Sequence, residues 1–166
     1  QDGLALEHCY VRNETILNAA IKSNASAISF VEKPSLDLCK LAIRKKPHSI
    51  RLIQNCDETV WIEAIRKNAT IIRYLESQTE RLANIAIESN PLSIKYIHHP
   101  SGVLLQKAVA LNFEAIRYIG EPSEALCLLA LSQSEQAFFF INNKSKTDKI
   151  IEYYNKMKRK TRVCRQ

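Results

Sequence analysis

The sequence predicts an all-α protein: an α-solenoid of 22-residue two-helix repeats that ends in a C-terminal capping helix. Three observations lead to this prediction. The chain has a strict 22-residue period, cap-forming side chains precede each helical segment, and the pattern changes after residue 143. With 166 residues the chain is long enough to bury a core.

Alanine marks the repeat, because it recurs every 22 residues over six units without a gap. The alanines are Ala20, Ala42, Ala64, Ala86, Ala108 and Ala130. An aliphatic residue always follows, and further apolar columns lie eight and eleven places after each alanine. So many columns in one register identify internal repeats.

The first helix of each repeat is expected to begin after a capping residue. These residues are Asn13, Ser35, Asp57, Thr79, Ser101 and Ser123. Their side-chain oxygens can accept hydrogen bonds from the first turn of a helix. Apolar residues follow at helical spacing, as in "SLDLCKLAIRKK" (35–46).

A second helix is predicted after a column of asparagines four places beyond the alanines. The column holds Asn24, Asn68, Asn90 and Asn112, with Ser134 in the last unit and Lys46 as a departure. Pro47 and Pro91 come next, at a position where a missing N–H costs nothing. We expect about two turns, for example over residues 91–98. Helices this short need neighbours, which favours a stacked solenoid.

The two ends of the chain depart from this pattern. Residue 1 falls just before the asparagine column, so the repeat domain (1–143) begins inside a repeat and at least one more helix is expected upstream. Residues 144–166 are predicted to form a capping helix and a basic tail. Within them, Ile150, Ile151, Tyr154 and Met157 form an apolar edge.

The charge is concentrated in that tail. Residues 144–166 hold nine basic and two acidic residues, whereas the 15 bases and 15 acids of residues 1–143 cancel. No apolar run approaches the ~18 residues of a membrane span. Five cysteines without a CxxC motif favour reduced thiols. We therefore expect a cytoplasmic protein without a membrane partner.

The blocks "AIKSNASAISFV" (20–31), "AIRKNATIIRYL" (64–75), "AIESNPLSIKYI" (86–97) and "AVALNFEAIRYI" (108–119) carry a resemblance. They are similar to the DUF4116-like short helical repeat proteins of bacteriophages and giant viruses. The resemblance covers about residues 1–143. It implies a viral or phage protein that acts in the host cytoplasm and binds a host factor.

No constellation of residues predicts catalysis. Three glycines cannot form a Gly-rich phosphate loop, and the four histidines lack metal-ligand spacing. Cys39 and Cys127 share an apolar column, which favours a place in the core over a nucleophilic role. We therefore expect no enzyme, no cofactor, no metal and no small-molecule substrate.

One column points to a binding surface. Nine places after the alanines lie Arg51, Arg73, Lys95 and Arg117, which we call the basic column. Lys22, Arg44 and Arg66 form a shorter second basic column, and Lys158, Arg159 and Lys160 lie in the tail. These bases fit an anionic partner, but the same pattern is also typical of a solvated helix face. The adjacent Tyr74, Tyr96 and Tyr118 could stack on nucleic-acid bases, although their place between two core columns favours packing between repeats.

The sequence is compatible with three functions. The first is a non-enzymatic interaction protein that binds a host or viral protein with an acidic surface, in host takeover or counter-defence. The second is binding of single-stranded nucleic acid along the basic column and the tail. The third is a structural or assembly role.

Overall fold

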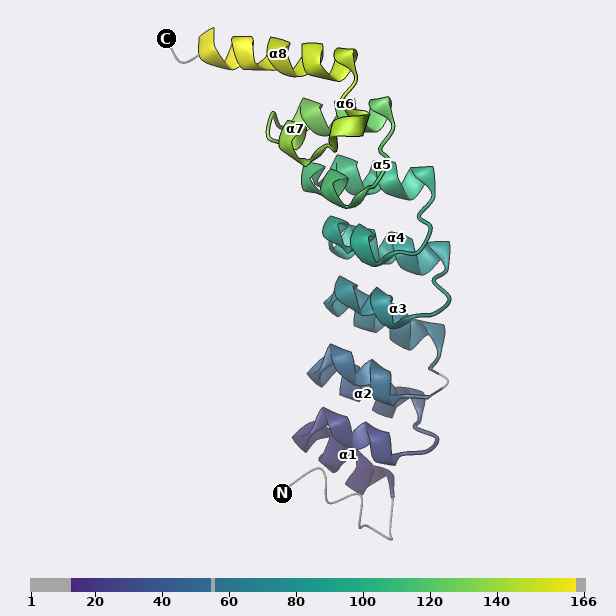
Figure 1. Cartoon of the computed structure of the whole chain (residues 1–166). Helices are drawn as coiled ribbons and strands as arrows, with labels where there is room; N and C mark the ends of the chain where they lie inside the picture. The colour runs from purple at the N-terminus through teal and green to yellow at the C-terminus, as the bar shows by residue number, and fades with distance from the viewer. Residues whose placement is uncertain (1–12, 55, 164–166) are drawn as a thin grey trace. The chain divides into compact units, whose positions relative to one another are not determined.

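The computed structural model describes residues 13–54 and 56–163; for residues 160–163 it describes the backbone alone. Every regular element in this part of the chain is a helix, which confirms the all-α class. The chain divides into two compact units, Gln1–Ser89 and Asn90–Gln166. Figure 1 shows the helices of each unit following one another in chain order.

In the first unit, α-helices alternate with 3-10 helices (η). Their bounds are α1 (Glu14–Ser23), η2 (Ala25–Phe30), α2 (Leu36–Lys45), η3 (Pro47–Leu52), α3 (Glu58–Lys67), η4 (Ala69–Tyr74) and α4 (Glu80–Ser89). Each of α2, α3 and α4 packs on the α-helix before it.

The second unit begins with the same alternation and ends differently. Its elements are η5 (Pro91–Tyr96), α5 (Gly102–Leu111), η6 (Phe113–Tyr118), α6 (Glu124–Gln133), α7 (Ala137–Phe140), η7 (Asn143–Ser145) and α8 (Asp148–Val163). Here α5 packs on α6, and α8 packs on α6.

The predicted caps of the α-helices are present. Asn13 Oδ1 accepts from the Ile16 N–H at 2.9 Å, before α1. Ser101 Oγ accepts from the Leu104 N–H at 3.3 Å, before α5. The α-helices of the first six repeats start 22 residues apart, so one capping position serves each of them.

From η2 to η6, the second helix of the repeat is shorter and tighter than expected, whereas the last repeat has the short α-helix α7 at this place. The helix predicted over residues 91–98 is a 3-10 helix that ends at Tyr96. The N–H of Ile97 bonds to the carbonyl of Ile94, three residues back, at 3.1 Å. Asn90 and Ile97, which flank this helix, are both extended. Six residues between two extended caps leave little room for i→i+4 bonds, so the tighter i→i+3 pattern closes the turn.

Apolar columns form the core of both units. Five of the six repeat alanines are fully buried: Ala42, Ala64, Ala86, Ala108 and Ala130. The aliphatic residues that follow the alanines are also at 0% exposure, for example Ile65 and Val109. Side chains this small let neighbouring helices approach closely, which fixes the spacing of the repeats.

Lys46 offers a test of the asparagine column. Lys46 has the same extended backbone as Asn68, yet its side chain makes no capping bond. Asn68 Oδ1 accepts from the Thr70 N–H at 3.1 Å. We expect Lys46→Asn to add the missing acceptor and to raise the free energy of unfolding by about 0.5–1 kcal/mol. Urea unfolding followed by circular dichroism measures the change.

The control for this prediction is Lys46→Ala, which removes the same charge without supplying an oxygen. Equal stabilisation by Lys46→Asn and Lys46→Ala would show that charge, and not capping, is responsible.

The C-terminal helix docks through one side only. Ile150 of α8 is fully buried, whereas the neighbouring Ile151 is 39% exposed, so the predicted apolar edge was wrong at Ile151. Adjacent residues of a helix are about 100° apart, so only one of these two side chains can face α6. Lys149 forms an ion pair with Glu124 of α6 at 2.6 Å. Within the described residues, no helix combines the length and apolarity that crossing a bilayer requires.

Candidate functional site

The basic column lies on the 3-10 helices. Arg51 is on η3, Arg73 on η4, Lys95 on η5 and Arg117 on η6, and all four side chains are exposed. Each comes one residue after a buried isoleucine of its helix, for example Ile72 before Arg73. The repeat therefore places every base on the outer side of its 3-10 helix.

In the first unit, two arginines share one tyrosine ring. The guanidinium carbon of Arg51 lies 4.9 Å from the ring centroid of Tyr74, and that of Arg73 lies 4.8 Å away. Nη2 of Arg73 also donates to the Tyr74 hydroxyl at 2.6 Å. The ring of His48 meets Tyr74 edge-on, with centroids 6.0 Å apart. Cation–π contacts of this kind are attractive even at exposed sites.

The arginines also change the acidity of Tyr74. The hydrogen bond from Arg73 is the main reason that the pKa of Tyr74 is lowered, and the positive charges of Arg73 and Arg51 act in the same direction. Partial desolvation of the phenol opposes them. The lowered pKa indicates that positive charge is concentrated around this ring.

The second unit repeats the arrangement. Nζ of Lys95 lies 4.9 Å from the ring centroid of Tyr96 and 5.2 Å from that of Tyr118. The guanidinium carbon of Arg117 lies 5.7 Å from Tyr118 and 4.7 Å from Phe140. Each of these bases thus contacts the aromatic ring of its own repeat and that of the next repeat.

These contacts affect how the basic column and the adjacent tyrosines can bind a partner. A cation that rests on a ring loses rotamer freedom before any partner arrives, so less entropy is lost when it binds a carboxylate. A guanidinium stacked on a ring can still donate through its N–H groups, which point outward in its plane. The same contacts cover ring surface that a nucleic-acid base would need for stacking.

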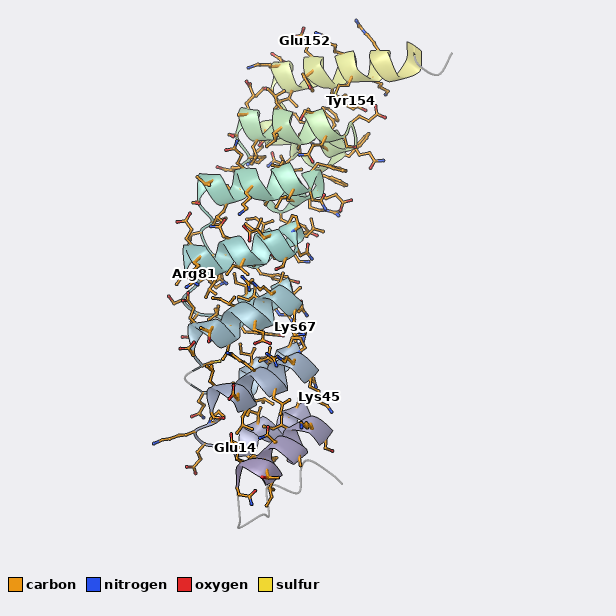
Figure 2. The ribbon with its side chains drawn as sticks, turned by 180° about the vertical axis from the view of Figure 1, so that it is seen from behind. Glu14, Lys45, Lys67, Arg81, Glu152 and Tyr154 are labelled. Carbon is orange, nitrogen blue, oxygen red and sulfur yellow. The ribbon has the colours of Figure 1, made fainter. Side chains whose placement is uncertain are left out.

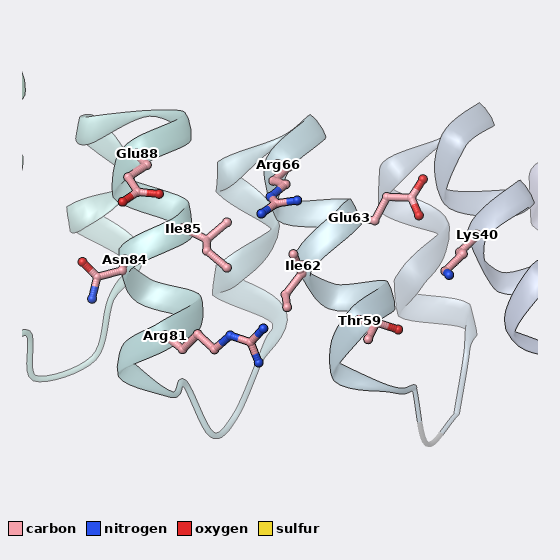
Figure 3. A pocket seen from close by; sticks show the side chains of 9 residues that line it. All are labelled: Lys40, Thr59, Ile62, Glu63, Arg66, Arg81, Asn84, Ile85 and Glu88. Carbon is pink, nitrogen blue, oxygen red and sulfur yellow. The ribbon is translucent and has the colours of Figure 1, made fainter.

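The second basic column lies on the α-helices instead. Nε of Arg44 on α2 pairs with Glu63 of α3 at 2.8 Å. Arg66 lines an open groove of about 670 Å³ over α3 and α4 (Figure 3). Ile62 and Ile85 lie at the centre of this groove, with Arg66 and Arg81 at its two ends (Figure 3). Arg81 also pairs with Glu58 at 3.0 Å. Arg44 is therefore partly neutralised, and the groove mixes both signs of charge.

The basic residues of the tail do not act as one cluster. Nζ of Lys158 lies 5.8 Å from the ring of Tyr154. Arg159 lines a shallow groove on another side of α8, together with Asp148 and Glu152. The side chain of Lys160 falls outside the described residues.

The cysteines match the predicted core role. Cys39 and Cys127 are buried, and burial raises the pKa of both thiols. Burial also raises the pKa of Cys56 to about 12, helped by the nearby Cys39 and Asp57. Thiols with raised pKa are poor nucleophiles at neutral pH. Across the described side chains, no group of three or more His, Cys, Asp or Glu is placed to hold a metal ion.

Sequence reasoning identified the bases but not their contacts with the rings. Residues of adjacent columns lie side by side in the chain, as Lys95 and Tyr96 do, but the contact from Lys95 to Tyr118 spans 23 residues. The adjacency of the two columns in every repeat was the signal for this contact. The sequence also did not predict an aromatic cluster of Phe138, Phe139 and Tyr154, because Tyr154 lies beyond the repeat domain.

Comparison of the chain with protein-family models, curated proteins and solved structures finds no match.

Proposed function

We propose that the chain is a non-enzymatic α-solenoid that binds a partner protein with an acidic surface through the basic column. The observation that carries this proposal is the repeated contact between bases and rings on η3 to η6. Arginine and tyrosine are also, with tryptophan, the residues enriched at binding hot spots. The 22-residue period runs through six units of the sequence without a gap, which supports the α-solenoid part of the proposal.

The cellular setting follows from the resemblance to DUF4116-like repeats and belongs to the same proposal. The partner is then a host or viral protein, the location is the host cytoplasm, and the role is host takeover or counter-defence. A basic surface of this kind raises the association rate with an acidic partner and selects against basic ones.

Single-stranded nucleic acid is the second candidate, favoured by the alternation of bases and rings. Two features count against it. The cations already cover ring surface, and residues 1–143 carry as many acids as bases. Nucleic-acid binding usually draws on many uncompensated phosphate contacts and weakens steeply with salt.

Affinity purification of the full chain from cells, scored for protein and for nucleic acid, tests the proposal. We expect a protein partner that survives nuclease treatment and is lost in the variant Arg51→Ala/Arg73→Ala/Lys95→Ala/Arg117→Ala. The matched control removes four exposed lysines outside both basic columns: Lys33→Ala/Lys46→Ala/Lys67→Ala/Lys144→Ala.

The two variants lose the same charge, so a specific interface distinguishes them. Equal loss of the partner in both variants would show that binding depends on total charge and not on the basic column. Capture that disappears with nuclease and follows a steep salt dependence would establish nucleic-acid binding instead.

A further inference from the structure

An exposed aromatic cluster lies at the end of the second unit. Phe138 and Phe139 of α7 and Tyr154 of α8 form it. The rings of Phe138 and Tyr154 stack with centroids 4.0 Å apart. The ring of Phe139 stands edge-on to both, at 6.1 Å from Phe138 and 6.3 Å from Tyr154. The stack supports Phe139, which is 70% exposed.

Phe139 occupies the repeat position that holds a base in the four preceding repeats. The same column contains Arg51, Arg73, Lys95 and Arg117. On either side of Phe139 in the chain, Ala137 and Ile141 are buried, so α7 turns Phe139 outward as the earlier repeats turn their bases outward. A large apolar side chain therefore follows four successive bases at this repeat position.

Two lysines contact this ring cluster. Nζ of Lys146 lies 4.6 Å from the ring of Phe138, and Nζ of Lys158 lies 5.8 Å from that of Tyr154. Arg117 lies on the ring of Phe140, the residue next to Phe139. In the described part of the chain, no carboxylate pairs with Lys146 or Lys158; Lys146 donates to Asn143 Oδ1 at 3.1 Å.

The nearby acids point elsewhere. Glu152 lies on the opposite side of α8 from Tyr154 (Figure 2), and Asp148 lines the same shallow groove as Glu152. Glu124 accepts from Lys149 and Thr147. The surface around Phe139 is therefore apolar at its centre, with the ammonium groups of Lys146 and Lys158 at its edge.

We propose that this surface, which we call the Phe139 site, binds a protein segment in which an apolar side chain is flanked by carboxylates. The apolar side chain packs on Phe139, and the carboxylates meet Lys146 and Lys158. An aromatic anchor inside a charged rim is the usual arrangement of a binding hot spot. The site rests on the proposed protein-binding function and identifies the chemistry of the partner.

A protein segment fits this surface better than a nucleic-acid strand. Strand binding uses a series of open ring faces along a basic groove. Here Phe138 and Tyr154 already cover one another, which leaves Phe139 as the one open ring of the cluster. A single anchor with a cationic edge matches one apolar residue between acidic ones.

Selection of a random 12-residue peptide library on the purified full chain tests the site. We expect enrichment of peptides with an aromatic or aliphatic residue flanked by Asp or Glu. For a fluorescein-labelled selected peptide, Phe139→Ala should weaken binding about 10-fold or more, and Lys146→Ala or Lys158→Ala about 3-fold or more. Fluorescence anisotropy measures the affinities.

Val103→Ala is the matched control, because Val103 is 69% exposed on α5 of the same unit. It should leave the affinity within about 2-fold. Enrichment without acidic residues, an unchanged affinity for Phe139→Ala, or tighter binding of a labelled dT12 oligonucleotide than of the peptides would overturn the site.

A second variant separates this site from the proposed function. If Arg51→Ala/Arg73→Ala abolishes peptide binding while Phe139→Ala has no effect, the chain binds protein through the basic column and the Phe139 site is wrong. If neither variant nor Lys95→Ala/Arg117→Ala changes binding, both proposals fail.

Discussion

Replacing Ile150 by alanine is expected to lower the free energy of unfolding of the second unit by about 2–5 kcal/mol. Ile150 of α8 is fully buried, at 0% exposure. The stacking of Tyr154 on Phe138 adds about 0.5–1.5 kcal/mol. The exposed ion pair from Lys149 to Glu124 contributes little. Without Ile150, α8 should therefore detach from α6.

The adjacent residue supplies the control. Ile151→Ala makes the same chemical change at a side chain that is 39% exposed, and it should cost far less. Urea unfolding by circular dichroism gives the two free energies. Trypsin should cut the lysines and arginines of α8 faster in Ile150→Ala than in the parent chain. Equal effects of the two substitutions would mean that α8 does not dock through Ile150.

Enlarging a repeat alanine is expected to have the second-largest effect. Ala64 of α3 is at 0% exposure, and the following Ile65 is equally buried. α3 packs against both α2 and α4, so Leu at position 64 must push at least one neighbour away. We expect Ala64→Leu to lower the free energy of unfolding by about 1–3 kcal/mol.

Ala19→Leu is the matched control, because Ala19 is exposed on α1 of the same unit. Leucine and alanine have similar helix propensities, so this change should be close to neutral. Thermal and urea unfolding of the two variants compares them. An unchanged free energy of unfolding in Ala64→Leu would show that the helices in this unit are loosely packed at the alanine column.

Much of the fold was open to prediction because its signals are local. A side-chain oxygen before a helix, a proline at its first position and an apolar residue every three or four places all act within a few residues. The caps at Asn13 and Ser101 are of this kind, and the structure contains both. The burial of Ala42 and Ile43 follows from the same periodicity.

The type of the second helix was not open to prediction in the same way. Residues such as Ile94 and Tyr96 fit α-helices and 3-10 helices alike, because both place i and i+3 on one side. The backbone is extended at Asn90 and Ile97, which limits η5 to six residues, and η5 packs against α5 and η6. That limit depends on neighbours and not on propensity.

By itself, the sequence determined the all-α class, the 22-residue spacing of the helix starts and the presence of a base at one position of four successive repeats. Only the tertiary structure decided what those bases contact. Whether Lys95 reaches Tyr118 depends on the distance between η5 and η6, which packing against α5 sets. The exposure of Phe139 likewise depends on where α8 places Tyr154. Contacts between repeats arise from how helices pack, so a column of bases becomes a set of ordered cations only in the folded chain.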